Sequence, residues 1–295
     1  MAHRFGIHAG VWGFDWTPAA ADRTIAAAAN AGYELIEIPA IDRTALDARD
    51  TVRALERHGI HPSVSLALSF DDDITDADPA RVARGEHRLR EAVRFAGDIG
   101  ATFVGGVVFS AMRRYLDLPT VEGRDRSLGV LRDVAALAER SGITLGIEYV
   151  NRYESNLLNT AAQTARFVDD LGAPNVVVHL DTFHAAMEET SLGDAVATAG
   201  DRLGYIHASE SHRGRLGTGT IDWPRLMGDL DAAGFTGPIT VETFSPAVVG
   251  DASAIDIGLW HPGWTDPDEL AAESLAFLRS CVTHDAPADP PNTLV

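Results

Sequence analysis

The chain of 295 residues alternates along its length between short apolar segments and longer helix-periodic ones. Eight of the short segments are rich in β-branched or aromatic residues and lack the strict polar–apolar alternation of a half-exposed strand. Such segments are typical of parallel strands that are covered on both faces. The predicted strands are Phe5–His8, Leu35–Ile38, Ser63–Leu68, Thr102–Phe109, Thr144–Tyr149, Val176–Leu180, Gly204–His207 and Ile239–Glu242.

Each predicted strand is followed by a stretch with apolar residues at three- and four-residue spacing, which indicates an amphipathic helix. Most of these stretches stop before a glycine, as at His58-Gly59, and two start at an Asp-Pro pair, as at Asp78-Pro79. The predicted helices are Ala19–Ala31, Ala45–His58, Arg81–Ile99, Arg126–Ser141, Ala161–Leu171, Gly193–Ala199, Trp223–Ala233 and Asp268–Ser280.

Eight successive strand–helix units of roughly 35 residues predict an α/β fold, a (β/α)₈ TIM barrel. The alternative, a doubly wound open sheet, is disfavoured because no glycine fingerprint follows the first predicted strand. We expect one domain, the catalytic barrel, over residues 1–284. The Pro-rich stretch 285–295 is expected to be a disordered C-terminal tail.

The charge balance limits the classes of partner. Lys and Arg number 24 against 43 Asp and Glu, so the formal net charge is −19. A surface of this charge repels phosphate backbones and anionic lipids, so we expect no nucleic-acid partner and no membrane partner. The single cysteine, Cys281, cannot form an internal disulfide and is expected to act as a small apolar residue of the last helix. With no apolar leader and no run long enough to span a bilayer, the sequence predicts a soluble, cytoplasmic protein.

Four consecutive predicted strands, the fifth to the eighth, end in an ionisable residue. These are Glu148, Asp181, His207 and Glu242. In a TIM barrel the carboxyl ends of the strands meet at the face that carries the chemistry. Three carboxylates in a poorly solvated barrel mouth remain ionised only beside a cation, so the pattern predicts one divalent metal ion. A set of oxygen ligands with one imidazole suits Mn²⁺, Mg²⁺ or Co²⁺ better than a zinc site of the thiolate type, and it leaves positions open for a substrate.

A second group of polar residues follows these strand ends in the predicted loops: Glu154, His184 and Arg213. Each on its own is explained as a solvated loop residue. Their common position, in loops that would overhang the metal, favours a role in binding the substrate.

His8 and several aromatic residues are candidates for the wall of the pocket. We expect Trp16, Phe109 and Trp260, together with Trp12 and Phe14, to offer ring faces to the CH groups of a ligand. Core packing is the favoured role for at least half of these aromatic residues, because aromatic side chains dominate protein cores.

With these residues in view, the chain resembles the ketose 3-epimerases, the D-tagatose 3-epimerase and D-allulose 3-epimerase family, within the xylose-isomerase-like TIM barrel superfamily. The resemblance lies in Gly146-Ile147-Glu148, His179-Leu180-Asp181-Thr182-Phe183-His184, Glu210-Ser211-His212-Arg213-Gly214 and Glu242-Thr243-Phe244, and it covers nearly the whole chain in order. It implies that Glu148, Asp181, His207 and Glu242 bind the metal, with Mn²⁺ as the expected ion and Co²⁺ or Mg²⁺ as alternatives. It also implies that Glu154, His184 and Arg213 bind the ketose around O1 and O2, and that the protein is a homodimer or homotetramer.

The same residues suit the chemistry of epimerisation. Inversion at C3 of a 2-ketose removes the proton beside the C2 carbonyl and returns one to the opposite face, so it needs two groups that exchange protons. Glu148 and Glu242 are the candidates, and a metal ion would stabilise the charge that develops on the enediolate oxygen. Two positions depart from the family: His8, where aromatic residues are usual, and the loop Phe109-Ser110-Ala111-Met112, which lacks an expected Trp. The preferred ketose therefore stays open.

Several other functions use the same metal site or the same barrel. The loop from Thr243 to Leu259 contains no Lys or Arg, which favours an unphosphorylated sugar over a sugar phosphate. The alternatives are an aldose–ketose isomerase, a cyclitol (inosose) dehydratase, an enzyme that processes 3-keto-glycosides or C-glycosides, a nucleic-acid repair enzyme, and a non-catalytic metal or sugar binder. The net charge argues against nucleic-acid repair, and the paired carboxylates Glu148 and Glu242 argue against a binder.

Overall fold

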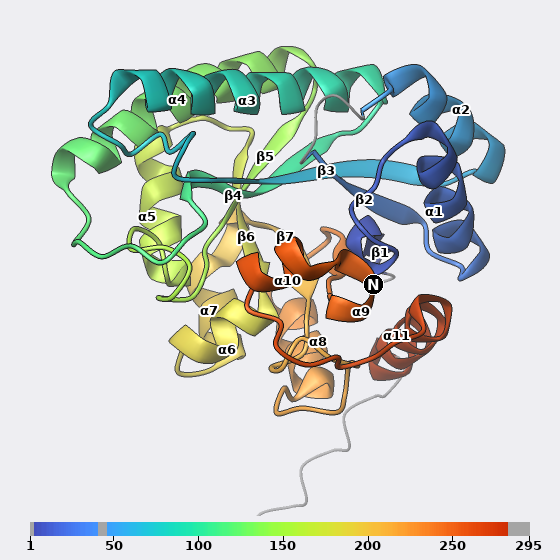
Figure 1. Ribbon diagram of the computed structural model, residues 1–295. Helices are drawn as coiled ribbons and strands as arrows, with labels where there is room; N and C mark the ends of the chain where they lie inside the picture. Colours follow the sequence, from blue (N-terminus) through green and yellow to red (C-terminus); the bar gives the residue numbers. More distant parts are fainter. Residues whose placement is uncertain (1–2, 41–45, 283–295) are drawn as a thin grey trace, which may run out of the picture.

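The inner wall of the protein is formed by eight strands, each hydrogen-bonded to the next in sequence order. In the computed structural model, which describes residues 3–40 and 46–282, all neighbouring strands are parallel and β8 pairs with β1 to close the barrel (Figure 1). The predicted TIM barrel is confirmed. The strands are β1 (Phe5–His8), β2 (Leu35–Pro39), β3 (His61–Leu68), β4 (Phe103–Ala111), β5 (Thr144–Glu148), β6 (Val176–Asp181), β7 (Leu203–Ala208) and β8 (Ile239–Val241).

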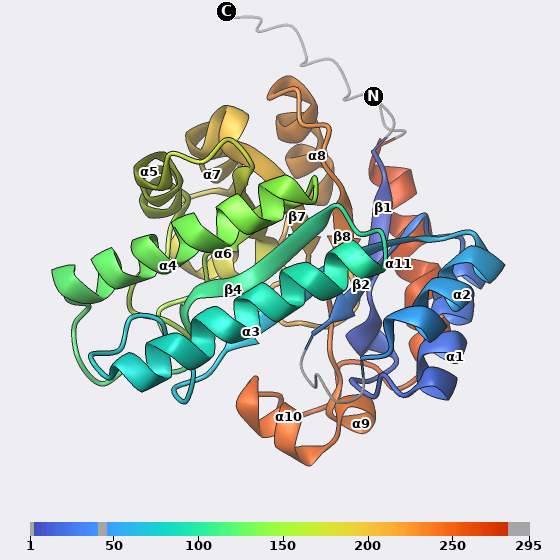
Figure 2. The same ribbon diagram turned by 90° about the horizontal axis from the view of Figure 1, so that it is seen from above.

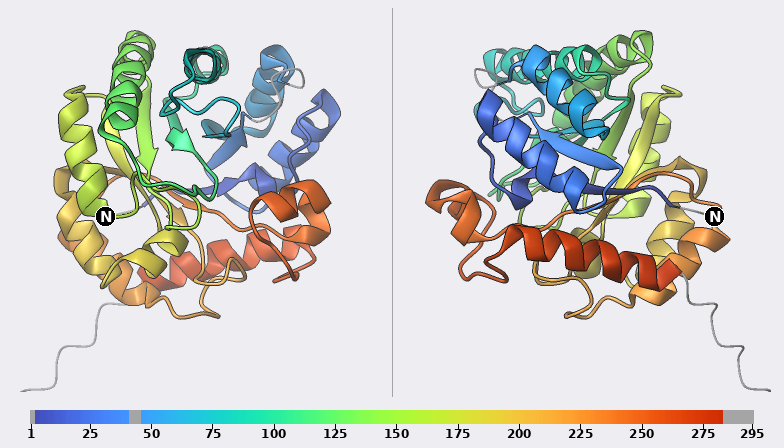
Figure 3. Two further views of the ribbon diagram at one scale, coloured as in Figure 1. Left: turned by 60° about the vertical axis from the view of Figure 1, so that its left-hand side comes forward. Right: turned by 90° about the vertical axis from the view of Figure 1, so that its right-hand side faces the viewer.

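Helices surround the strands on the outside of the barrel (Figure 3). The helices that follow the strands are α1 (Pro18–Asn30), α2 (Ala48–His58), α3 (Pro79–Asp98), α4 (Val121–Arg140), α5 (Ala161–Leu171), α7 (Leu192–Ala199), α8 (Trp223–Ala232) and α11 (Pro267–Val282). All eight correspond to predicted helices. The largest difference is at α4, which begins five residues before the predicted start because the Thr120 side chain accepts a hydrogen bond from Gly123 N and caps it.

Five short helical segments were not predicted, because none is long enough to show a helical period. They are η1 (Ala9–Val11), α6 (Thr182–Glu188), η2 (Gly200–Arg202), α9 (Pro246–Val249) and α10 (Asp251–Asp256). Helices α9 and α10 follow β8 and lie at the end of the barrel where β1 finishes (Figure 2). They therefore belong to the face at which the carboxyl ends of the strands meet. The predicted tail over residues 285–295 lies outside the described residues.

Alternate residues of each strand face the inside of the barrel, and they form layers. The layer furthest from the mouth contains Leu35, Phe103 and Tyr205, with the rings of Phe103 and Tyr205 stacked at 4.0 Å. Glycines on the neighbouring strands make room for it, since a Cβ atom on Gly6 or Gly146 would overlap the side chains of this layer.

The next layer toward the mouth is polar, which is unusual for a barrel interior. Glu37 and His207 lie two residues further along their strands than Leu35 and Tyr205, and the His179 ring of β6 meets the His207 ring edge-on. All three residues are at most 1% exposed. Buried polar groups of this kind require partners. The layer therefore indicates that a polar site lies next to it, at the mouth of the barrel. No helix among the described residues is both long and apolar enough to cross a membrane.

Candidate metal centre

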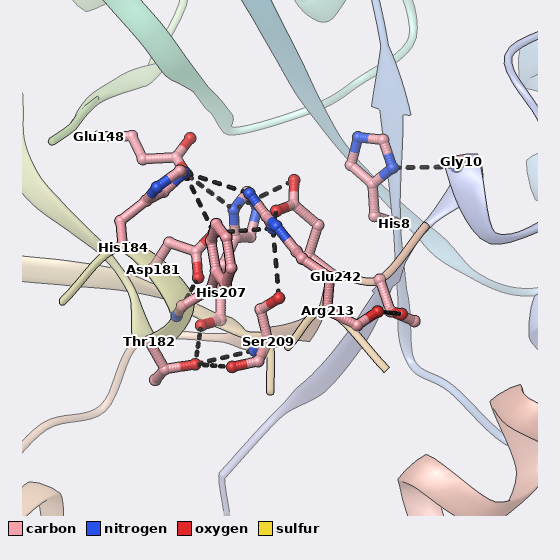
Figure 4. Close-up of polar contacts among 12 residues, drawn as sticks. His8, Gly10, Glu148, Asp181, Thr182, His184, His207, Ser209, Arg213 and Glu242 are labelled. Carbon is pink, nitrogen blue, oxygen red and sulfur yellow. Dashed lines mark hydrogen bonds and ion pairs between the residues drawn. The ribbon is translucent and has the colours of Figure 1, made fainter. Parts of the chain in front are cut away.

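The strand ends bring the four predicted metal ligands together. Glu148 ends β5, Asp181 ends β6, His207 lies in β7 and Glu242 follows β8 directly. One ligand atom from each residue lies within 4.8 Å of the corresponding atom of every other, and all four side chains are buried (Figure 4). A single ion can therefore reach all four groups, as the sequence pattern predicts.

The electrostatics of the four residues fit a cation. Burial raises the pKa of Glu148 and raises the pKa of Asp181 strongly, and the Glu242 carboxylate adds to both shifts. Burial also acts on Glu242, but His207 and Arg213 outweigh it and hold the pKa of Glu242 low. The centre thus concentrates carboxylates whose ionised forms need more positive charge than one guanidinium and one imidazole supply. The residues present fit a divalent metal ion.

His207 is held with its two ring nitrogens in different surroundings. Nδ1 lies 3.3 Å from Glu148 Oε1 and 3.5 Å from Glu242 Oε1, inside the cluster of ligands. Nε2 points away from the cluster and lies 2.9 Å from Glu37 Oε1. Burial raises the pKa of Glu37, but the charge and hydrogen bond of His207 outweigh it and lower that pKa to about 2.

Arg213 spans two of the ligands from the loop after β7. Its Nη1 atom donates to Asp181 Oδ2 at 3.0 Å and to Glu242 Oε2. The guanidinium also stacks on Phe183, with Cζ 4.1 Å from the ring centroid. Arg213 is the one non-glycine residue with positive φ (59°) among those that the structure describes, so the loop holds it in a strained conformation.

Glu210 anchors the loop that carries Arg213. It is fully buried and accepts hydrogen bonds from Ser211 N at 2.8 Å, from Gly217 N at 2.9 Å and from Trp223 Nε1 at 2.9 Å. Two donors from the loop and one from α8 meet on this carboxylate and fix the loop's shape. The position of Arg213 is therefore restricted by a rigid loop.

The other two predicted substrate-binding residues lie beside Arg213. His184 is on α6, and its Nε2 atom is 3.2 Å from Arg213 Nη2. The side-chain amide of Asn151 lies 2.9 Å from His184 Nδ1 and donates to Glu154 Oε1 at 2.7 Å. Glu154 thus sits behind His184, linked to it through Asn151.

A cavity of about 240 Å³ opens above the four ligands. It falls just below the range usual for drug-sized ligands, so it suits a small molecule. Among the predicted residues that line it are His8, Glu148, His184, His207, Arg213 and Glu242. Asp181 is completely buried beneath the cavity, and Glu154 is not part of its lining.

The expectation for the aromatic wall is corrected at four positions. The residues that do not line the cavity are Trp12, Trp16, Phe109 and Trp260. Trp12 instead donates from Nε1 to Asp268 Oδ1 at 2.8 Å. Trp16 is buried and donates from Nε1 to Thr51, Phe109 packs in the core against Phe167, and Trp260 is 76% exposed. Phe244, which follows β8, lines the cavity instead, and Phe14 does so as expected.

Glu37 is the residue of this centre that the sequence interpretation missed. It lies inside β2 rather than at a strand end, where ionisable residues were sought. A usable signal was present, since a charged residue flanked by Ile36 and Ile38 in a buried strand requires a partner. Asn151 and Glu210, both in loops, carried no comparable signal.

Comparison with known proteins defines the class of this barrel. Residues 25–281 match the xylose isomerase-like TIM barrel family, and the chain belongs to that family. It is 38% identical to an L-ribulose 3-epimerase of Methylomonas sp. (strain DH-1) over 275 residues, which cover 93% of this chain and 96% of the relative. It is 36% identical to a ketose 3-epimerase of Arthrobacter globiformis, over 95% of this chain and 97% of the relative.

A solved structure agrees with these relatives. The crystal structure of the D-allulose 3-epimerase from Methylomonas sp. in complex with D-allulose matches this chain with a TM-score of 0.91 at 38% identity. The match covers 95% of this chain and 98% of that one. The resemblance to ketose 3-epimerases is confirmed, and the relatives are carbohydrate epimerases, a class of isomerase.

Proposed function

We propose that this protein epimerises C3 of an unphosphorylated ketose of the D-tagatose, D-allulose, D-fructose or L-ribulose type, with one divalent ion at the centre. The observation that carries the proposal is the placement of Glu148 and Glu242. These carboxylates come from β5 and from the end of β8, lie in one cluster and line one cavity. A two-base inversion requires two such groups at one carbon.

Glu148, Asp181, His207 and Glu242 would hold the ion, and Mn²⁺ suits a set of three carboxylates and one imidazole. When bound, the ion supplies Lewis-acid stabilisation of the charge that develops on the ketose oxygens. Glu148 and Glu242 would carry the protons, one removing the C3 proton to give a cis-enediolate and the other returning a proton to the opposite face. The two exchange roles when the reaction runs in reverse.

Arg213 and His184 would orient the substrate. Both line the cavity beside the ligands, and their nitrogen atoms can hydrogen-bond the oxygens at C1 and C2. Glu154 supports His184 through Asn151. Fixed donors of this kind keep C3 between the two proton-transferring carboxylates.

The charges of the cavity wall favour a neutral sugar. Three arginines line the cavity, and each is already paired with a carboxylate. Arg88 donates to Asp72, Arg113 lies 3.1 Å from Asp256, and Arg213 spans Asp181 and Glu242. A phosphate would have to displace one of these pairs in an acidic mouth, so the substrate is proposed to be unphosphorylated.

Proton NMR of the products tests the proposal. Metal-reconstituted protein is incubated with D-fructose, D-tagatose and L-ribulose in D₂O. A 3-epimerase gives the C3-inverted ketose with deuterium at C3. Formation of an aldose would identify an aldose–ketose isomerase, and loss of water would identify a dehydratase. If every ketose stays unchanged with Mn²⁺, Co²⁺ and Mg²⁺, the proposal is wrong.

A further inference from the structure

The structure assigns to Glu37 a positioning role: it accepts the Nε2 proton of His207 and thereby directs Nδ1 at the metal ion. The inference rests on the proposed metal centre, but not on which sugar is the substrate. Glu37 is not one of the four clustered ligands and does not line the cavity. It therefore acts through His207, with which it shares a hydrogen bond.

The geometry separates the two nitrogens of His207. Nδ1 is the ring atom that joins the four-ligand cluster, at 3.3 Å from Glu148 Oε1. Nε2, on the other side of the ring, lies 2.9 Å from Glu37 Oε1, a normal hydrogen-bond distance. One nitrogen is thus available to the ion and the other to a carboxylate.

The proton count then fixes the tautomer. An ionised carboxylate can only accept, so the contact with Glu37 requires a proton on Nε2. A neutral imidazole carries one proton, which leaves the lone pair on Nδ1 free for a metal ion. Carboxylate–histidine–metal arrangements of this type set both the orientation and the basicity of the ligand.

Packing holds the ring in this orientation. His207 meets the His179 ring edge-on, with centroids 4.1 Å apart, and the His8 ring at 6.4 Å. Glu37 lies opposite on β2, where strand pairing fixes it between His8 and Ser63. The carboxylate therefore faces a ring that packing has already restricted.

A purely structural role does not explain Glu37. The side chain is completely buried, and Oε2 has no hydrogen-bond partner among the described residues. His8 Nε2 is 3.9 Å from Oε1, beyond hydrogen-bond distance. Burying a carboxylate for one hydrogen bond is unfavourable for stability, whereas orienting a metal ligand is a function that needs that one bond.

Calorimetric titration with Mn²⁺ alone tests the role in four proteins: wild type, Glu37→Leu, Glu37→Gln and Ser63→Ala. Glu37→Leu removes the acceptor and should weaken Mn²⁺ binding about 10- to 100-fold. Glu37→Gln keeps an acceptor oxygen and should lose less. Ser63→Ala is the matched control, because Ser63 is fully buried beside Glu37 but bonds to Tyr205 instead; its affinity should equal that of wild type.

A second measurement needs no variant at position 37. With diamagnetic Zn²⁺ bound, nitrogen-15 NMR of the wild type should show the His207 proton on Nε2, the resonance being assigned by its absence from His207→Asn. A proton on Nδ1 would overturn the inference. So would Glu37→Leu binding Mn²⁺ as tightly as wild type, or Ser63→Ala losing as much affinity as Glu37→Leu.

Failure of this inference is distinguishable from failure of the proposed function. If wild type binds no Mn²⁺, both are overturned. If it binds Mn²⁺ and Glu37→Leu matches it, only the role of Glu37 is lost. If Glu37→Leu weakens binding but no ketose is turned over, the positioning role holds and the epimerase proposal fails.

Discussion

Strands β5–β8 and strands β1–β4 form the two halves of one closed barrel, yet different kinds of residue lie at the mouth of each half. Every member of the four-ligand cluster comes from the β5–β8 half, and so do Arg213 and His184. The β1–β4 half contributes His8, two serines, the carboxylate-paired Arg88 and Arg113, and apolar groups to the cavity wall. Its one carboxylate near the centre, Glu37, faces the ligand His207 and not the cavity.

This division places the proposed catalytic groups in the β5–β8 half and much of the cavity wall in the β1–β4 half. The groups proposed to bind the ion and move protons are crowded into half of the rim, where His207 and Arg213 offset part of the carboxylate charge. Apart from Glu37, which contacts His207, the opposite half can vary in size and polarity without disturbing them. We therefore expect substitutions of the polar groups at the ends of β5–β8 to abolish turnover, and those of the cavity wall from β1–β4 to change which ketose is preferred.

The largest effect is expected from Glu148→Gln and Glu242→Gln. Each removes a carboxylate proposed to transfer a proton and to bind the metal ion while keeping nearly the same shape, so kcat/KM should fall about 10³-fold or more. Steady-state kinetics on the best ketose of the panel measures the loss. Ser65→Ala is the control from the other half, a cavity-lining strand residue that should stay within about fivefold of wild type, since one neutral hydrogen bond contributes about 1 kcal/mol. Equal losses in both halves would contradict the division.

The second effect in size is expected from Arg213→Lys. A lysine keeps the charge but has no planar fork, so its single nitrogen cannot contact Asp181 and Glu242, as Nη1 does, and His184, as Nη2 does, at the same time. Misplaced by about 1 Å, the substrate should be turned over roughly 10²-fold more slowly. Arg215→Lys, two residues further along, is the matched control, because Arg215 pairs with the exposed residues Glu269 and Glu273 and should tolerate the change. Similar losses in both variants would show that the loop responds to any change in its arginines.

The two halves also differ in how well the sequence predicted them. The ligands of β5–β8 were predictable because each is an ionisable residue where an apolar strand ends, and parallel strands bring such positions together. Glu37 was not predicted, because the same reasoning does not examine the interior of a strand. Its role depends on which residue lies across the barrel, and that follows from the closure of the sheet.

The cavity wall was the least predictable part of the site. Trp16 and Phe109 are apolar and near strand ends, as a wall residue would be, yet both pack in the core. The sequence alone does not decide whether an aromatic ring near a strand end packs in the core or lines the cavity, because both environments offer apolar contacts. The short helices α9 and α10, which complete the mouth, lack the length that a helical period needs to show.

The β1–β4 half can be tested through His8→Phe. The change removes the hydrogen bond of 3.1 Å between His8 Nε2 and Ser65 Oγ and puts a larger apolar ring in the cavity wall. We expect the ratio of kcat/KM for a ketohexose over L-ribulose to fall about 10-fold, since the longer sugar needs more of the cavity. Trp16→Phe, an aromatic change on the same segment but outside the cavity, should leave the ratio unchanged. If His8→Phe left the ratio unchanged, the β1–β4 half would not determine which ketose is preferred.

The smallest effect is expected where the two halves meet across the mouth. Arg113, from the loop after β4, lies 3.1 Å from Asp256 on α10, which follows β8. Both side chains are partly exposed, so the pair contributes at most about 1 kcal/mol, and added salt weakens it. Asp256→Asn should raise KM about two- to fivefold at low salt with kcat unchanged, and the difference from wild type should shrink as salt is added. The control is Asp251→Asn, an exposed acid at the start of the same helix that does not line the cavity. If Asp256→Asn changed kcat rather than KM, the pair would take part in the chemistry, and the mouth could no longer be divided between the two halves.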